Sequence, residues 1–430
     1  MSDRFDLLVI GAGPGGLVAA ATASAVGMRV CLIDDNPSAG GQIWRGGVTP
    51  KNTSADAADW IGRIQNSNVE TRFGWRAVAA PSPRVLRVEQ FGQCEDIEYS
   101  SLILATGARE RFLPFPGWTL PGVYGAGGLQ AFVKSGLNIR GKRVVVAGTG
   151  PLLLAVAAHL RASGAQIASI VEQAPAKRLA QFSIGLLQEQ FGKLVEGARY
   201  ALATTGVPYR TGAWVTSAAG HQQLEKVTIR SGSHILEVET DMLAIGFHLV
   251  PNTELAQLLN CEIASGFVSV DGFQQTSVKG VYCVGELTGI GGMDKAKLEG
   301  RIAALAAAGQ PQKAKLLFKK RERQVRFARN LNAAFALREE LRQLAMADTF
   351  VCRCEDVSYR ELASCNSWRE AKLHTRCGMG PCQGRICAPA AGFLFGWKAP
   401  APRPPLFPVE VGSLRETDTD SSPAVATRAS

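Results

Sequence analysis

A mostly apolar stretch that runs into a glycine turn and then into a second apolar stretch occurs twice along the chain. In the first copy, residues 6–10 predict a short strand, and Gly11, Gly13 and Gly16 follow in the spacing G-x-G-x-x-G. The apolar residues after Gly16 predict a helix whose N-terminal N–H groups would face the phosphates of a dinucleotide. This pattern predicts an α/β fold with a nucleotide site at the turn.

The glycines of this turn and the acid that ends the next strand have distinct expected roles. Gly11 permits the tight turn, Gly13 lets the backbone approach the pyrophosphate, and Gly16 lets the helix pack against the strand. The strand predicted over residues 29–33 ends at Asp34, whose carboxylate lies where a ribose hydroxyl would bind. The candidate cofactor-binding residues of this unit are Gly11, Gly13, Pro14, Gly15, Gly16, Asp34 and Asp35.

The second copy covers residues 142–160 and departs from the pattern at one position. Gly148 and Gly150 match the first two glycines, but Leu153 stands in place of the third. A branched side chain there would push the helix from the strand and crowd a pyrophosphate. The following strand ends at Glu172, which would suit NAD better than NADP. We expect a retained fold with a degenerate site, and binding of NAD(P) is the less favoured alternative.

Composition limits the class and the location of the protein. Of the 430 residues, 46% are hydrophobic and 20% are charged, which is typical of a globular chain of about two to four domains. The N-terminal residues lack a signal-peptide pattern, and no apolar run approaches the roughly 18 residues of a spanning helix. We therefore expect a cytoplasmic protein, with peripheral attachment to the inner face of the cytoplasmic membrane as an alternative.

Part of the net charge of +10 lies between Lys313 and Arg329, where basic residues alternate with apolar ones. This stretch predicts a basic helix, either a solvated face beside a domain junction or a dock for an acidic partner or an anionic membrane. Nucleic acid is not an expected partner because no binding module accompanies the charge.

Six of the ten cysteines lie between Cys352 and Cys387. A C-x-C pair, Cys352 and Cys354, is followed by a C-x4-C pair, Cys382 and Cys387, and Cys377 lies just before the second pair. Four thiolates are what an iron–sulfur centre needs, and zinc is the alternative metal. No cysteine occurs between Cys94 and Cys261, so disulfide reductase chemistry is not expected.

Further motifs give the chain a resemblance to flavoproteins with two dinucleotide-binding domains, the glutathione and thioredoxin reductase class. They are GGQ at 40–42, the ATG crossover in 101–117, a second crossover in 241–253 and a late flavin motif in 276–292. In that class the acid of the late motif reaches the ribityl chain or pyrophosphate, and here it is Glu286 where Asp is usual. The resemblance implies FAD and adds the binding residues Gly41, Gln42, Ala105, Thr106, Gly107, Gly285 and Glu286.

The segment from Thr349 to about Ala391 resembles the small helical domain of bacterioferritin-associated ferredoxin. That resemblance implies a [2Fe–2S] cluster. The ligands it assigns are Cys352, Cys354, Cys382 and Cys387, with Cys377 in reserve.

The combination of GAGPGGL, GGQIWR, GTGPLLL, PNTEL, VGELTGIGG and CRCEDV…CGMGPCQGRIC is more specific than any one motif. It resembles the alpha subunits of bacterial multi-subunit amine and imino-acid dehydrogenases, including opine oxidase, D-hydroxyproline dehydrogenase and hydrogen cyanide synthase. The resemblance implies a beta subunit of the D-amino-acid-oxidase type that oxidises the C–N bond. It also implies a small ferredoxin-like subunit in some members, and a respiratory electron acceptor.

The expected layout is two Rossmann-like domains followed by a small helical [2Fe–2S] domain. Residues 1–120 with 245–310 form the FAD-type domain, 121–244 an inserted NAD-like domain, 311–346 a basic linker helix, 347–400 the cluster domain, and 401–430 a Pro-rich arm for a partner surface with a disordered tail. The expected function is electron relay from a partner flavin. A stand-alone NAD(P)H-dependent reductase and an architectural subunit holding ADP or ATP are the alternatives.

Overall fold

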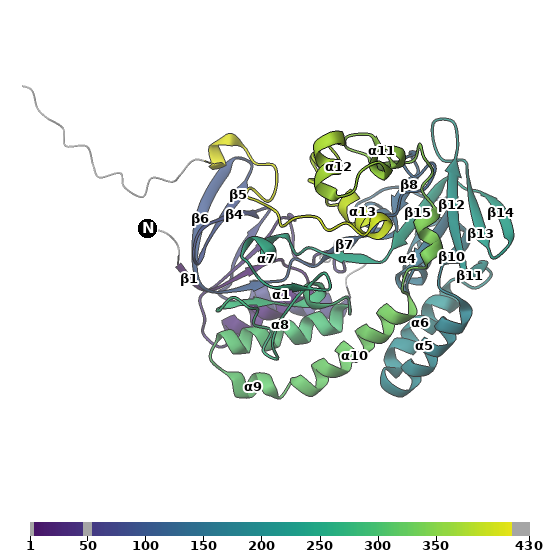
Figure 1. Cartoon of the computed structure of the whole chain (residues 1–430). Helices are drawn as coiled ribbons and strands as arrows, with labels where there is room; N and C mark the ends of the chain where they lie inside the picture. Colours follow the sequence, from purple (N-terminus) through teal and green to yellow (C-terminus); the bar gives the residue numbers. More distant parts are fainter. Residues whose placement is uncertain (1–3, 46–53, 415–430) are drawn as a thin grey trace, which may run out of the picture.

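The computed structural model describes residues 4–45 and 54–414, which fold into two α/β units and a small helical domain (Figure 1). The tail expected to be disordered, 415–430, lies outside the described residues. None of the described helices is both long and apolar enough to cross a membrane.

The first unit is built on a seven-stranded sheet of order β3-β2-β1-β6-β5-β4, with β19 added beside β6. β1, β2, β3, β19 and the end of β6 run parallel, whereas β4, β5 and the start of β6 form an antiparallel meander. The strands are β1 (Arg4–Ile10), β2 (Val30–Asp34), β3 (Glu70–Phe73), β4 (Arg76–Ser82), β5 (Val85–Gln90), β6 (Gln93–Leu104) and β19 (Val281–Cys283).

Both faces of the parallel part are covered, which explains its continuous apolar strands. Leu8 and Ile10 of β1 enter one buried cluster and Leu7 and Val9 the other. The helices and short elements of this unit are α1 (Pro14–Ala25), α2 (Ala55–Gln65), α7 (Glu254–Leu258), β17 (Ile263–Ala264), β18 (Phe267–Val268), the 3-10 turn η1 (Gly285–Thr288) and α8 (Met293–Ala307).

Helices α1 and α8 pack so closely that only glycine fits between them. A Cβ on Gly300 would lie 2.2 Å from the carbonyl oxygen of Gly15. This contact brings the N-terminus of α8 and the late motif at Gly285 to the same end of the sheet as the first glycine turn.

The second unit has a parallel five-stranded sheet of order β11-β10-β9-β15-β8 and a separate antiparallel sheet, β12-β13-β14. Its strands are β8 (Val123–Gly125), β9 (Arg143–Thr149), β10 (Gln166–Glu172), β11 (Tyr209–Thr211), β12 (Ala213–Ala219), β13 (Lys226–Ser231), β14 (His234–Glu239) and β15 (Met242–Phe247). Its helices are α3 (Ala126–Lys134), α4 (Leu152–Ala162), α5 (Ala176–Glu189) and α6 (Phe191–Ala203).

Two antiparallel strands, β7 (Ala108–Glu110) and β16 (Leu249–Pro251), carry the chain between the units. The stretch expected as one linker helix forms two helices and a 3-10 turn instead: α9 (Pro311–Lys315), α10 (Phe318–Ala334) and η2 (Glu339–Gln343). The break after α9 accompanies the packing of Leu317 and Phe318 against the buried Ile302 and Leu305 of α8. α10 then runs along the lower edge of Figure 1 toward α5.

The small C-terminal domain contains β20 (Phe350–Cys352), β21 (Val357–Ser358), α11 (Tyr359–Ala363), α12 (Trp368–Thr375) and α13 (Cys387–Phe395). The Trp118 indole N–H donates to the carbonyl of Phe350 over 2.6 Å, which ties this domain to the second unit.

The Pro-rich arm, which we expected to meet a partner surface, lies on the chain's own first unit. Leu406 is buried in the core beside the meander, and its N–H donates to the carbonyl of Val78. The hydroxyl of Ser413, in the 3-10 turn η3 (Val411–Leu414), donates to the buried Glu89 carboxylate. The hydrogen bond fixes the end of the arm, because the Ser413 hydroxyl and the Glu89 carboxylate are both buried and need a partner.

Candidate nucleotide site and cysteine centre

The first glycine turn has room for a phosphate at the expected place. A Cβ on Gly11 would lie 2.3 Å from the carbonyl oxygen of Ala105, and one on Gly16 would lie 1.8 Å from that of Gly11. A Cβ on Gly13, by contrast, would meet nothing within 4 Å. Gly11 and Gly16 are therefore required by packing, whereas Gly13 borders open space that a pyrophosphate could fill.

The N-terminus of α1 and the acid at the end of β2 complete this cradle. No side chain caps α1 and its first turn holds no acid, so the N–H groups after Pro14 point to the turn unshared. Asp34 is buried and accepts from the N–H of Ala12 and from the backbone and side chain of Asn36. The carboxylate is thus fixed at the strand end, with lone pairs left for a ribose hydroxyl.

The remaining expected binding residues line the same end of the sheet. A Cβ on Gly41 would lie 2.9 Å from the Cα of Gly13, while the neighbouring Gln42 is exposed. On the crossover, Thr106 and Asn252 exchange two hydrogen bonds of 2.8 Å, and the N–H of Asn252 donates to the carbonyl of Gly107. Asn252 was not singled out in the sequence, although it stands within the second crossover motif.

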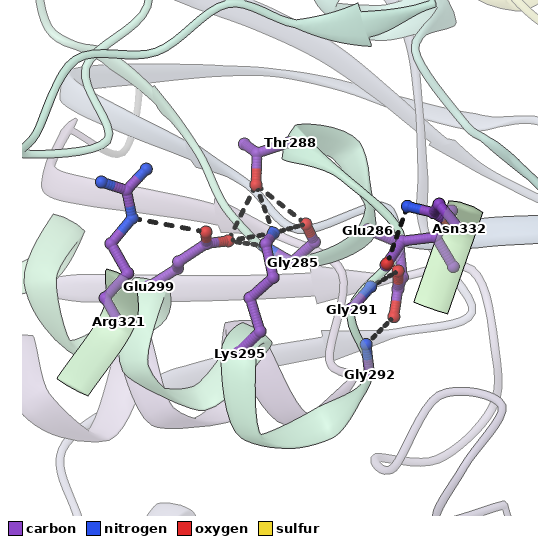
Figure 2. Close-up of polar contacts among 10 residues, drawn as sticks. Gly285, Glu286, Thr288, Gly291, Gly292, Lys295, Glu299, Arg321 and Asn332 are labelled. Carbon is purple, nitrogen blue, oxygen red and sulfur yellow. Dashed lines mark hydrogen bonds and ion pairs between the residues drawn. The ribbon is translucent and has the colours of Figure 1, made fainter. Parts of the chain in front are cut away.

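Glu286, the acid of the late motif, makes hydrogen bonds within its own loop. Its two carboxylate oxygens accept from the N–H groups of Gly291 and Gly292, each over 2.9 Å (Figure 2). Burial raises the pKa of this carboxyl. The extra methylene relative to Asp lets the carboxylate fold back onto its own loop just before α8.

A buried ion pair makes hydrogen bonds to the backbone of Gly285. The Lys295 ammonium lies 2.9 Å from the Glu299 carboxylate, and both side chains are almost fully buried. Glu299 accepts from the backbone N–H of Gly285, and Lys295 donates to the backbone carbonyl of Gly285 (Figure 2). The guanidinium of Arg321, on α10, lies 3.6 Å from the Glu299 carboxylate. Sequence reasoning missed this network, for which the i,i+4 spacing of Lys295 and Glu299 was the available signal.

In the second unit, the acid at the end of β10 occupies donors of its own glycine turn. Glu172 is fully buried, and its carboxylate accepts from the Gly150 N–H over 2.7 Å and from the Thr149 hydroxyl over 2.8 Å. The N–H of Ala174 donates a third hydrogen bond. The donor that would meet a pyrophosphate is therefore already satisfied. Burial outweighs these hydrogen bonds and raises the pKa of Glu172 to about 7.

The linker after α10 covers this acid. Gln173 donates to Thr149 and to the carbonyl of Ala336, and it accepts from the N–H of Arg338. Phe335 is buried against Ala174. These contacts fill the end of β10, where an adenosine ribose would lie.

Leu153 does not itself point to the phosphate position. Its side chain is 2% exposed and packs in the core between α4 and the sheet with Val144, Val146 and Val156. Leu153 is therefore a core residue, and the contacts found at the turn itself are those of Glu172 and the linker.

Five cysteines of the C-terminal domain gather at one place. The Sγ atoms of Cys352, Cys377 and Cys387 all lie within 4.8 Å of one another. Cys382 is close enough to hydrogen-bond with both Cys387 and Cys354. A Cβ on Gly380 would lie 2.3 Å from the Cβ of Cys354, so this position in the loop needs glycine. Cys365 lies apart, with its thiol facing the carbonyl of Glu361.

The close approach of these thiols shifts their pKa values in opposite directions. Thiol donors from Cys377 and Cys387 lower the pKa of Cys352 to about 2, and the thiol of Cys387 lowers the pKa of Cys382 to about 5. The pKa of Cys387 is correspondingly raised. So many sulfurs can all be thiolates only beside a multiply charged cation, and thiolates are the ligands of iron–sulfur and zinc sites.

Comparison with known proteins decides the family. A family model described as pyridine nucleotide-disulphide oxidoreductase matches residues 5–311, more than half of the chain. The chain belongs to this family. The expected α/β fold with two nucleotide-binding-type units is confirmed, and so is assignment to the oxidoreductases.

Named relatives share nearly the whole length. The hydrogen cyanide synthase subunit HcnB of Pseudomonas aeruginosa is 31% identical, over 88% of this chain and 90% of that protein. An opine oxidase subunit of Agrobacterium tumefaciens is 32% identical, over 90% of this chain and 85% of that protein. These two confirm the resemblance stated from the motifs. The crystal structure of L-proline dehydrogenase from P. horikoshii has a TM-score of 0.70 at 20% identity, covers 97% of this chain and 81% of that chain, and supports the fold.

Proposed function

We propose that this chain is the electron-transfer component of a hetero-oligomeric dehydrogenase that oxidises the C–N bond of an amino acid, imino acid or opine. Its donor is the flavin of a partner of the D-amino-acid-oxidase type, and a respiratory acceptor, in some complexes through a small ferredoxin-like subunit, takes the electrons. The full-length relatives bear the names of subunits of hydrogen cyanide synthase and of opine oxidase, and these names support a shared assembly.

The observation that carries the proposal is the combination of one open nucleotide site, one closed one and a cluster of five cysteines. The open site lies at Gly13 and Asp34 and the closed one at Glu172. Because the second site is filled by the chain itself, NAD(P)H is not the proposed electron source. The substrate-oxidising chemistry then belongs to the partner, and this chain's residues set distance and potential.

The four proposed ligands of a [2Fe–2S] cluster are Cys352, Cys354, Cys382 and Cys387. Cys352 neighbours Cys387 and Cys354 neighbours Cys382, which gives two pairs for two irons. Cys377 is the reserve, next to the first pair. A bound cluster would supply one-electron transfer, and the cysteines hold it in a domain packed on both α/β units.

The first site would hold FAD through the backbone of Gly11–Gly16 and the carboxylate of Asp34. One observation favours a second candidate, ADP or ATP in an architectural role. Each Glu286 carboxylate oxygen already accepts from the N–H of its own loop, so the acid that the motif offers to the riboflavin half of FAD is partly engaged. Heat extraction of the purified chain followed by chromatography separates the two, because released FAD supports the first and released ADP or ATP the second.

The relay is tested by the double substitution Cys352→Ser and Cys382→Ser in the reconstituted complex. We expect the iron content and dye-linked turnover to be lost while nucleotide content is unchanged, because the glycine turn lies in another domain. Cys365→Ser is the matched control, since Cys365 belongs to the same domain but lies outside the cluster. Full turnover in the double variant contradicts the relay.

A further inference from the structure

A polar junction joins the first unit's crossover to the cysteine loop. We define it as Arg109, Asn252, Glu254 and Arg385. The Arg109 guanidinium lies 2.8 Å from the Glu254 carboxylate and donates to the Asn252 side chain over 2.7 Å. Asn252 is itself locked to the backbone of Thr106. A continuous hydrogen-bonded path therefore begins at the ATG crossover of the open nucleotide site.

The path ends beside the proposed cluster ligands. Arg109 Nε donates to the carbonyl of Arg385 over 3.0 Å, and Arg385 stands between Cys382 and Cys387 in the sequence. The Arg385 guanidinium lies 3.4 Å from the carbonyl of Cys382 and 4.0 Å from Glu254. It stacks on Phe407 of the Pro-rich arm, 4.3 Å from the ring centre, and donates to the carbonyl of Leu406. Three parts of the chain thus fix one guanidinium.

The junction holds one more positive than negative charge. Arg109 and Arg385 share Glu254, which is the one carboxylate in ion-pair range of either within the described part of the chain. The three side chains are 22%, 17% and 20% exposed. A partly buried excess cation is unfavourable unless an anion compensates it. After Glu254, the acidic group that acts on Arg385 is Cys382, whose carbonyl lies 3.4 Å from the guanidinium.

We propose that Arg385, held in place by Arg109 and Glu254, is a positioning residue that sets the reduction potential of the cluster from the side facing the open nucleotide site. The inference rests on the proposed function in that it requires an iron–sulfur cluster at the cysteines. Adding an electron makes such a cluster more negative, so a fixed cation beside it stabilises the reduced form. Because the junction is largely buried, salt screens this interaction less than it screens exposed arginines.

Because Arg385 and Glu254 carry opposite charges, removing each one should shift the reduction potential of the cluster in opposite directions. Arg385→Gln removes the excess cation and disfavours the reduced cluster. Glu254→Gln removes the compensating anion, leaves both guanidiniums, and favours the reduced cluster. Arg369→Gln makes the same charge change as Arg385→Gln on the exposed face of α12 and is the matched control.

The test is a redox titration of the purified full-length chain, followed by the electron paramagnetic resonance signal of the reduced cluster. We expect Arg385→Gln to lower the ratio of reduced to oxidised cluster about tenfold at a fixed potential, which is about 59 mV for one electron. Glu254→Gln should raise the ratio, and Arg369→Gln should leave it within a factor of about two.

Equal titration curves for the wild-type chain and Arg385→Gln, both with full iron content, overturn the proposal. If Arg385→Gln fails to assemble its cluster, Arg385→Lys and Glu254→Gln carry the test. The proposal then requires Arg385→Lys to stay near wild type while Glu254→Gln shifts upward, and it is overturned if Glu254→Gln shows no shift. A wild-type chain without an iron–sulfur signal overturns the proposed function, and this proposal with it.

Discussion

The two α/β units follow the same plan, and yet one of them presents an open turn and the other a closed one. In the first unit, Asp34 accepts from the Ala12 N–H. A Cβ on Gly13 would meet nothing within 4 Å, which is equally true of Gly150 in the second unit, so the difference lies in the acids. In the second, the side chain of Glu172 is one methylene longer than that of Asp34, accepts from the N–H of Gly150, and is fully buried. A strand–turn–helix motif therefore predicts the fold of a unit, whereas the groups that satisfy its donors decide whether a ligand can enter.

The linker is the second part of that difference. α10 starts beneath the first unit, where Arg321 meets Glu299, and ends on the second, where Phe335 packs against Ala174. Segment 335–338 contacts Gln173 beside the acid of the second unit, whereas Asp34 is buried within its own turn. The same linker thus stabilises one unit's late motif and closes the other unit's nucleotide site.

The largest expected effect is loss of nucleotide from the first unit by Gly13→Val. The backbone at Gly13 is extended and nothing lies within 4 Å of a Cβ there, so the chain should fold normally. The side chain would fill the space for the pyrophosphate, and we expect nucleotide content per chain to fall at least tenfold. The paired variant in the second unit is Leu152→Glu, at the exposed start of α4, and it should leave nucleotide content unchanged. Equal losses in both variants would place a ligand in the second unit.

Next in size is the cost of uncovering the closed site with Phe335→Ala. Removing this buried ring should lower the free energy of unfolding by about 3–5 kcal/mol. Limited proteolysis should then cut the segment after α10 faster than in the wild-type chain. Phe132→Ala, whose ring is 55% exposed, is the control and should change stability little. A stability of Phe335→Ala close to that of the wild type would mean that the linker does not close the second unit.

Leu153→Ala separates the two explanations of the closed site. Its buried side chain should cost about 2–5 kcal/mol when truncated. NADH should nevertheless fail to bind, as measured by calorimetry, because Glu172 still occupies the Gly150 N–H. Binding of NADH to this variant, with none to the wild-type chain, would restore the leucine as the cause.

The smallest expected effect is a dependence of stability on pH that originates in the second unit. Because the pKa of Glu172 is raised to about 7, the folded chain holds this proton more tightly than the unfolded chain, whose glutamates titrate near pH 4.3. The stabilisation is therefore present below about pH 4 and is lost as pH rises to 7, by at most about 4 kcal/mol. Thermal unfolding between pH 5 and 8 should show a decline that Glu172→Gln removes. An identical decline in the variant would assign it to other groups.

The sequence was sufficient for features that depend on local spacing. The G-x-G-x-x-G turn, the strand that ends at Asp34 and the cysteine pairs follow from neighbouring residues, and the structure brings the cysteines together. It was insufficient where distant segments meet. The contact of Arg338 with Gln173 and that of Arg109 with Arg385 span 165 and 276 residues, and tertiary packing alone creates them. For the same reason the Pro-rich arm, which reads as an extended tail, lies on the core beside Val78.

The central claim, that electrons reach this chain from a partner and not from NAD(P)H, is tested most directly by an anaerobic absorbance spectrum. The purified single chain is measured before and after excess NADH or NADPH, and then after dithionite. The account predicts a [2Fe–2S] spectrum that neither nicotinamide changes and that dithionite bleaches. Rapid bleaching of a flavin band by NADH or NADPH would contradict it and would make this chain a reductase in its own right.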